Sequence, residues 1–130
     1  MTMHNTIVVH FRDGRILKGV SSDFLPARTS FHLDDSETGN ITEVQVEGLK
    51  AVFFVKSLVG DASHNDNQHA ERTGYGKRIR VRFRDGETIR GYTSGYAPGR
   101  PAFFMFPADA ESNNEKIFVV TAATTDIQFV

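Results

Sequence analysis

An internal duplication is the feature that most restricts how this chain can fold. The segment VHFRDG from Val9 to Gly14 returns as VRFRDG from Val81 to Gly86, 72 positions later. The same offset pairs Ile7 with Ile79, Gly19 with Gly91, Ser22 with Ser94, Pro26 with Pro98, Arg28 with Arg100 and Phe31 with Phe103. Near the end of each copy the offset becomes 75, which pairs Val52 with Ile127 and places a three-residue insertion within 107–115. Such sustained similarity indicates two copies of one structural unit.

Each copy has the two-residue periodicity of β-strands. In the first copy Ile7, Val9 and Phe11 alternate with other residues, and in the second Ile79 and Val81 alternate with arginines. This alternation predicts half-buried strands. The Asp-Gly pair that follows in each copy tolerates the backbone conformation of a tight turn, so each first strand should return as a hairpin.

The register of the two hairpins can also be predicted. A three-residue loop that ends in glycine places Leu17 beside Val9 and Ile89 beside Val81. It also turns Gly19 and Gly91 toward the inner face, where a missing side chain lets a strand bend sharply.

The later strands complete a small all-β unit. A third strand is predicted at 30–33 or 102–106, a fourth at 42–46 or 116–121, and a tight turn leads into a last strand that is nearly all apolar in the first copy. Five short strands of this kind usually close into a barrel. We therefore predict two tandem five-stranded small barrels, at 1–56 and 77–130, joined by a flexible polar linker at 57–76. Units of about 55 residues bury little surface alone, so the two barrels should pack together.

The order of these signals resembles the Sm-like and SH3-type small barrels. More closely, the chain resembles an uncharacterised bacterial family of duplicated small-barrel proteins. Members share the stretches 24–33, 50–55 and 104–109, and the run Ser112-Asn113-Asn114. This resemblance implies a fold and no established activity. The RNA-reading loop of Sm proteins, Asp-x-x-x-Asn, is not matched, because Asp23 is followed by Leu25-Pro26-Ala27 without the asparagine.

Composition argues against several classes of protein. The net charge is −1, whereas domains dedicated to phosphate backbones are usually strongly basic. The apolar runs, such as Phe103 to Phe106, are too brief to span a bilayer. The segment 1–5 lacks the basic and apolar regions of a secretory signal, so we expect a cytoplasmic protein that does not enter membranes.

Recognisable catalytic motifs are also missing from the sequence. There is no Cys, no glycine-rich phosphate loop and no Gly-x-Ser-x-Gly elbow. The carboxylates that both copies share, Asp13 and Asp85, are explained by turn chemistry. We therefore expect a protein that is not an enzyme and that carries no cofactor.

The most distinctive shared motif is aromatic-x-Pro-x-Arg-x-x-Phe. It begins at Phe24 with Arg28 in the first copy, and at Tyr96 with Arg100 in the second. The guanidinium groups could bind carboxylate, phosphate or guanine edges, with the aromatic ring as a stacking surface. In the alternative interpretation the proline only shapes a turn, the final Phe enters the core and the arginine is solvated.

A second candidate site occurs in the second copy alone. The predicted register places Arg80 opposite Arg90 on the outer face, with Arg82 alongside and Tyr92 nearby. Like charges in opposed positions are destabilising, so an anion should compensate them. That anion is either a carboxylate of the same chain, from the linker or the other copy, or a phosphate of a nucleic acid or nucleotide.

Histidines do not indicate a metal site in the sequence. His64 and His69 lie in the linker and His10 and His32 lie on strands, without a recognised ligand spacing, so no metal is predicted.

Two functions remain open. The first is a module that binds a protein partner through the Pro-Arg loops, with a homodimer through exposed strand edges as a related case. The second is binding of RNA or an anionic nucleotide through the cations Arg80, Arg82, Arg90 and Arg100 and the ring of Tyr96.

Overall fold

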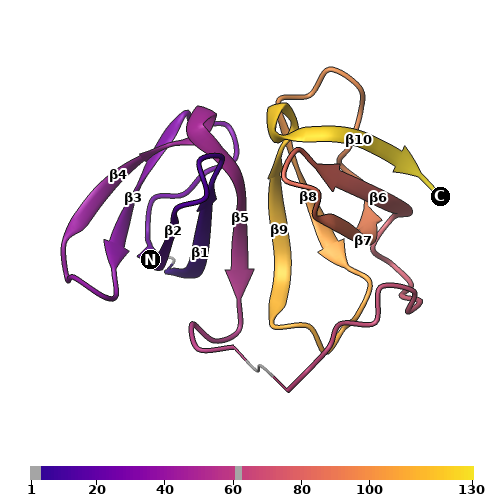
Figure 1. Ribbon diagram of the computed structural model, residues 1–130, viewed down its shortest axis with the longest axis horizontal. Coiled ribbons are helices and arrows are strands. Elements are labelled where there is room, and N and C mark those ends of the chain that lie inside the picture. Colours follow the sequence, from indigo (N-terminus) through magenta and orange to yellow (C-terminus); the bar gives the residue numbers. More distant parts are fainter. Residues whose placement is uncertain (1–3, 61–62) are drawn as a thin grey trace.

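The computed structural model describes residues 4–60 and 63–130 and confirms that the protein is all-β. Residues 1–3 of the predicted first repeat and residues 61–62 of the predicted linker lie outside the described ranges. The strands are β1 (Asn5–Phe11), β2 (Ile16–Ser21), β3 (Ser30–Asp35), β4 (Ile41–Gln45), β5 (Leu49–Val55), β6 (Lys77–Phe83), β7 (Thr88–Thr93), β8 (Ala102–Pro107), β9 (Asn114–Val120) and β10 (Thr124–Phe129). All ten pair antiparallel in one open sheet, in the order β10-β6-β7-β8-β9-β5-β1-β2-β3-β4 (Figure 1).

The two halves of the chain have the same internal strand order. In each half the last strand pairs with the first, and the first four strands then follow in sequence. A single turn of 3₁₀-helix precedes the last strand in both, as η1 (Val46–Gly48) and η2 (Thr121–Ala123). These turns coincide with the predicted tight turns.

The predicted hairpin register is confirmed in both halves. Val9 pairs with Leu17 in the first hairpin, and Val81 pairs with Ile89 in the second. Gly19 lies so close to the next strand that a Cβ atom would come within 2.0 Å of the Asp34 carbonyl oxygen. Gly91 has the same relation to the Phe106 carbonyl oxygen. Glycine is therefore required at these two positions, where β3 comes close to β2 and β8 comes close to β7.

Strands β5 and β9 join the two halves at the centre of the sheet (Figure 1). Val52 and Phe54 of β5 enter the hydrophobic core of the first half, while Ala51, Phe53 and Val55 enter that of the second. The same alternation holds in β9, where Phe118 and Val120 cross to the core of the first half. Because both faces of β5 are covered, all seven of its residues are buried, and the strand can carry the apolar run Ala51–Val55.

The hydrogen bonding does not close either half into a separate barrel. The last strand of the first half pairs with β9 of the second half rather than with β4. Within the described ranges, β4 and β10 remain the two free edges of the sheet. The predicted packing of the halves against each other therefore takes the form of a continuous sheet with two cores.

The connection between the halves contains no strand in its described part, and several of its residues bond to the second half. Arg72 donates a hydrogen bond to the Pro107 carbonyl oxygen at 3.0 Å, and Gln68 accepts one from the Arg90 backbone at 2.9 Å. No helix among the described residues has the length and apolarity needed to cross a membrane.

Candidate functional site

The two Pro-Arg loops have a common backbone geometry. The Arg28 N–H donates to the Leu25 carbonyl at 3.0 Å, and the Arg100 N–H donates to the Ala97 carbonyl at 3.2 Å. Each loop is therefore a β-turn with proline at its second position, where the fixed φ of proline is favourable. Phe31 and Phe103, which end the two motifs, are buried.

The two loops come together where the halves of the molecule meet. Pro26 and Ala27 of the first loop line two neighbouring grooves together with Pro101 and Ala102 of the second half, and Phe118 of β9 lines both as well. The sequence motif thus marks one composite surface rather than two separate loops.

The first groove has a volume of about 560 Å³ and contains the predicted Arg28. The guanidinium group of Arg28 has no hydrogen bond or ion pair with any residue that the structure describes. Arg12 also lines this groove and donates only to backbone carbonyls, those of Leu49 and Glu47. The groove therefore has two cationic side chains, of which neither is paired with a carboxylate.

The second groove has a volume of about 580 Å³ and contains the predicted Arg100. Arg100 differs from Arg28 because its guanidinium donates a 2.7 Å hydrogen bond to the Gly95 carbonyl of its own loop. Lys116 lies above the rings of Phe54 and Phe104, at 4.9 and 4.7 Å from their centroids. Among the described residues that line the two grooves, Glu47 is the one with a carboxylate.

The predicted aromatic stacking surfaces are not free. Phe24 is 8% exposed and packs edge-on against Phe31, Phe54 and Phe118, with ring centroids 5.1 to 5.2 Å apart. Tyr96 is half-buried against Phe103, at 4.8 Å between centroids. Phe24 therefore belongs to the core of the first half. A ring packed among other aromatic rings is more stable than a ring exposed on a loop.

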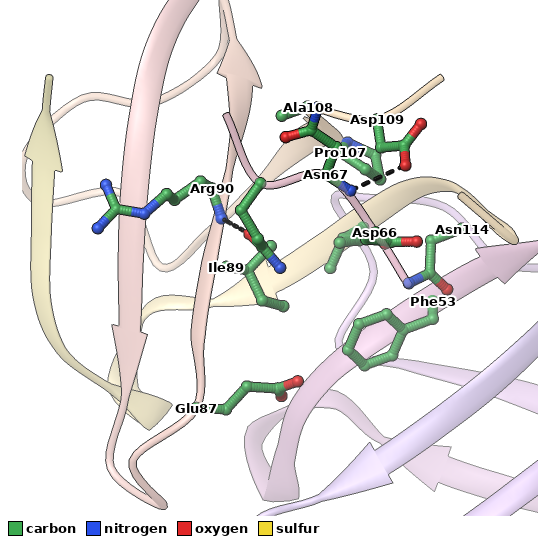
Figure 2. Close-up of a pocket in the computed structure, with 12 residues that line it drawn as sticks. Phe53, Asp66, Asn67, Glu87, Ile89, Arg90, Pro107, Ala108, Asp109 and Asn114 are labelled. Atoms are coloured by element: carbon green, nitrogen blue, oxygen red, sulfur yellow. Dashed lines mark hydrogen bonds between the residues drawn. The ribbon is translucent and has the colours of Figure 1, made fainter. Parts of the chain in front are cut away.

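The arginine patch of the second half is assembled only in part. Arg80 lies opposite Arg90 as the register predicts. Arg80 donates to Gln128 at 2.7 Å and lies 3.6 Å from a carboxylate oxygen of Asp126, so β10 supplies its partner. The guanidinium groups of Arg82 and Arg90 have no partner within the described ranges, and that of Arg90 points away from the adjacent cavity (Figure 2).

Tyr92 is buried and is not available for stacking at this patch. Its hydroxyl group receives a 2.9 Å hydrogen bond from Arg78 and donates one to the Ala70 carbonyl at 3.3 Å. The ring thus anchors the connection between the halves.

A small polar cavity lies under that connection, with a volume of about 70 Å³ (Figure 2). Its apolar wall is formed by Phe53, Ile89 and Ile117, and its polar residues include Asp66 and Asn114. Sequence patterns gave no indication of it, because its walls come from both halves and from the connection.

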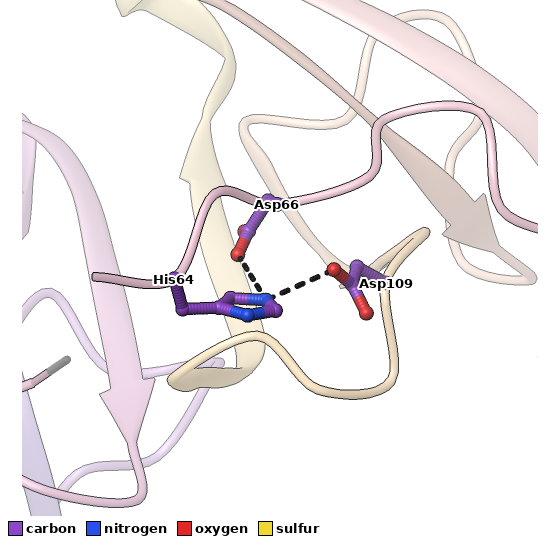
Figure 3. A group of neighbouring side chains, drawn as sticks. All are labelled: His64, Asp66 and Asp109. Carbon is purple, nitrogen blue, oxygen red and sulfur yellow. Dashed lines mark hydrogen bonds and ion pairs between the residues drawn. The ribbon is translucent and has the colours of Figure 1, made fainter. Parts of the chain in front are cut away.

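The structure also brings Asp109 to His64 and Asp66 of the connection, a grouping that the sequence analysis did not predict. His64 Nε2 lies 3.0 Å from Asp109 Oδ2 and 3.4 Å from Asp66 Oδ1 (Figure 3). Backbone N–H groups of Asn67 and Glu111 donate to Asp109 and hold the pKa of its carboxyl group below the usual value. Asp109 lies within the segment that the sequence offset identified as an insertion, 45 residues from His64. No spacing rule joins residues so far apart.

Comparison with known proteins assigns a family and no activity. No curated protein and no solved structure matches the chain. A family model described as a family of unknown function, DUF6982, matches residues 3–130. This match covers nearly the whole chain, and the protein therefore belongs to the DUF6982 family of unknown function.

Proposed function

We propose that the protein is a non-catalytic interaction module that binds an extended, acidic segment of a partner protein across the two grooves. The observation that carries the proposal is the meeting of both Pro-Arg loops at one composite surface. The floor of this surface is apolar, and its described lining contains the cations Arg12, Arg28, Arg100 and Lys116 and one carboxylate, that of Glu47.

The shape and charge of the surface favour a peptide. Partly buried apolar side chains such as Ala102 and Phe104 leave surface that a peptide can cover, and the surrounding cations provide charge-assisted hydrogen bonds to carboxylates. Arg28 is well suited to a bidentate contact with a carboxylate because its guanidinium forms no bond within the described chain.

Defined peptides test this proposal. A panel of short peptides that alternate Asp or Glu with Leu and Pro is titrated into ¹⁵N-labelled protein, with a matched panel in which Lys replaces the acids. The acidic panel should shift the backbone amide signals of Ala27 and Ala102, and the basic panel should not. Arg28→Ala should weaken binding about tenfold or more, the size of a lost charge-assisted hydrogen bond. Arg82→Ala is the control and should bind as the original protein does. The proposal fails if neither panel shifts these amides.

Binding of RNA or an anionic nucleotide is the alternative that the free guanidinium groups of Arg82 and Arg90 favour. Arg82 of β6 lies diagonally across from Arg90 of β7, two residues along β6 from the Arg80–Arg90 pair, and two such neighbouring cations suit a phosphate group. Phosphate-led binding should weaken steeply as salt rises, whereas an interface with a large apolar part should change little. Titration with single-stranded RNA at two salt concentrations separates the two functions, because the RNA should shift amides of β6 and β7 and leave those of the grooves unchanged.

The free sheet edges support a second copy of the chain as a further partner. We interpret each half as a small barrel of the Sm-like or SH3 type that opens toward its neighbour, which leaves β4 and β10 as complementary edges. Ile41 on β4 is 71% exposed and Phe129 on β10 is 49% exposed. By the repeat offset these two residues correspond to Lys116 and Phe54, which pair at the centre of the sheet.

Sedimentation velocity tests the self-association at increasing protein concentration. Phe129→Lys should abolish any concentration-dependent dimer, because it places a charge at the edge. The control is Val59→Lys, at a position that is 92% exposed and belongs to the connection between β5 and β6 rather than to an edge strand. A chain that stays monomeric at all concentrations, or a dimer that survives Phe129→Lys, overturns this interpretation.

A further inference from the structure

We propose that His64, Asp66 and Asp109 form a binding site for a divalent transition metal ion such as Zn²⁺. The site joins the connection between the halves, which supplies His64 and Asp66, to the turn between β8 and β9, which supplies Asp109 (Figure 3). It lies apart from the grooves, and it departs from the expectation that the protein binds no metal.

The spacing of the three donor atoms fits a metal ion. One donor atom from each residue lies within 4.8 Å of the other two. The distances from His64 Nε2 are 3.0 Å to Asp109 and 3.4 Å to Asp66. Ligands of tetrahedral zinc bond at about 2.0 to 2.2 Å, which puts neighbouring ligand atoms about 3.3 Å apart. A small inward movement of Asp66, which is exposed, would complete a three-residue ligand set.

The chemistry of the three donors is that of a transition metal site. One imidazole nitrogen and two carboxylate oxygens suit Zn²⁺ or Mn²⁺, whereas Mg²⁺ and Ca²⁺ prefer oxygen ligands alone. His64 Nε2 faces two carboxylates at once, and the single hydrogen of a neutral imidazole can serve only one of them. A cation at this position interacts with both.

The surroundings hold the ligands in place and leave room for water. The backbone N–H of Asn67 donates to Asp109 Oδ2 at 2.9 Å, and that of Glu111 donates to Oδ1 at 2.9 Å, so this carboxylate is oriented before any ion binds. A cavity of about 380 Å³ beside the cluster is lined by His64, Asp66 and Asn113. Three protein ligands with water in the remaining position is the arrangement of open zinc sites.

Binding of the ion would fasten the connection to the second half. The ligands come from segments 45 residues apart, so they are together only in the folded chain. The ion should therefore raise the melting temperature, because it binds the native state and not the unfolded one.

The experiment uses the full chain without a histidine tag. Zn²⁺ binding is measured by calorimetry and by the shift in melting temperature, and Co²⁺ serves as a spectroscopic substitute whose visible absorption reports the ligand geometry. We expect a single site per chain, a higher melting temperature with Zn²⁺, and no comparable effect of Mg²⁺. His64→Ala and Asp109→Asn should each weaken Zn²⁺ binding by about tenfold or more, since even an outer-shell partner has an effect of that size.

The matched control is His69→Ala, because His69 lies in the same connection and outside the cluster. It should bind Zn²⁺ as the original protein does. Asp109→Asn also weakens the hydrogen bonds that Asp109 accepts from Asn67 and Glu111, so the fold of this variant is checked by circular dichroism. If this variant is misfolded, the comparison with His64→Ala alone decides. The proposal is overturned if Zn²⁺ produces no heat and no thermal shift, or if His64→Ala binds it unchanged.

Discussion

Lys50 of β5 donates a 2.6 Å hydrogen bond to Asp85, which lies in the β6–β7 turn of the other half of the molecule. The same ammonium group also bonds to Glu87 at 2.5 Å and lies 4.8 Å from the centroid of the Phe83 ring. Lys50 is only 8% exposed, whereas both carboxylates are about half exposed. Without the two carboxylates the ammonium group would be a buried, unpaired charge, whereas without Lys50 the two carboxylates would remain in contact with water.

That asymmetry predicts which substitutions are costly. Replacing Asp85 and Glu87 together by Asn and Gln leaves a buried ammonium group without a counter-charge, and we expect it to lower the free energy of unfolding by about 2 to 3 kcal/mol. Lys50→Met leaves two carboxylates that water can solvate, so it should cost about 1 kcal/mol or less. Urea denaturation followed by circular dichroism measures both.

Asp13→Asn is the control for this comparison, because Asp13 occupies the equivalent turn of the first half and pairs with Arg15 on the surface. It should leave the urea midpoint unchanged. Equal losses from Lys50→Met and from the double substitution would show that the burial of the ammonium group does not govern the interaction.

The same contact should make the stability of the protein depend on pH in the acidic range. The hydrogen bond from Lys50 lowers the pKa of Asp85 below its ordinary 3.8 in the folded protein. A depressed folded pKa contributes stability that is present above the unfolded value and is lost as the pH falls through the folded value. Stability should therefore decline below about pH 4, and Lys50→Met should decline less steeply. Urea midpoints from about pH 7 to about pH 3 test this, and parallel curves for the two proteins would contradict it.

Gly91 should tolerate no side chain. An added Cβ would lie 2.0 Å from the Phe106 carbonyl oxygen, which belongs to the backbone of β8 and cannot move without disturbing the sheet. We expect Gly91→Ala to cost about 2 to 4 kcal/mol, measured by thermal and urea unfolding. Gly48→Ala is the control, since nothing lies within 4 Å of the added atom, and its effect should be small. A Gly91→Ala protein as stable as the control would mean that β7 and β8 lie farther apart.

Phe118 should couple the unfolding of both halves. It belongs to β9 of the second half but is buried in the core of the first, at 2% exposure. Phe118→Ala should cost about 3 to 5 kcal/mol because it leaves a cavity. It should also speed the hydrogen exchange of amides in β1, within the first half. Loss of protection confined to the second half would show that the two cores unfold independently.

Sequence reasoning succeeded where local chemistry decides the structure. The alternation of residues around Val9 and Val81 requires strands, and the Asp-Gly turns select the hairpin register. The need for glycine at Gly19 and Gly91 followed from the same register. The repeated Pro-Arg motif likewise pointed to the loops that now line the grooves.

The arrangement of the last strand could not be settled by the same reasoning. An apolar run such as residues 51–55 of β5 predicts a strand that is covered on both faces, and it does not indicate which segments cover it. Here the cover comes from the two cores, because β5 pairs with β9 of the other half. The burial of Phe24 and Tyr92 is a consequence of packing between distant segments.

By itself the sequence determined the strands, the turns and the repeated order of elements, because these depend on residues close together along the chain. The tertiary structure alone decided that the halves share one open sheet, that Arg28 and Arg100 lie on one surface, and that His64 meets Asp109. Contacts of this kind depend on how distant segments pack, and no local periodicity or spacing encodes them.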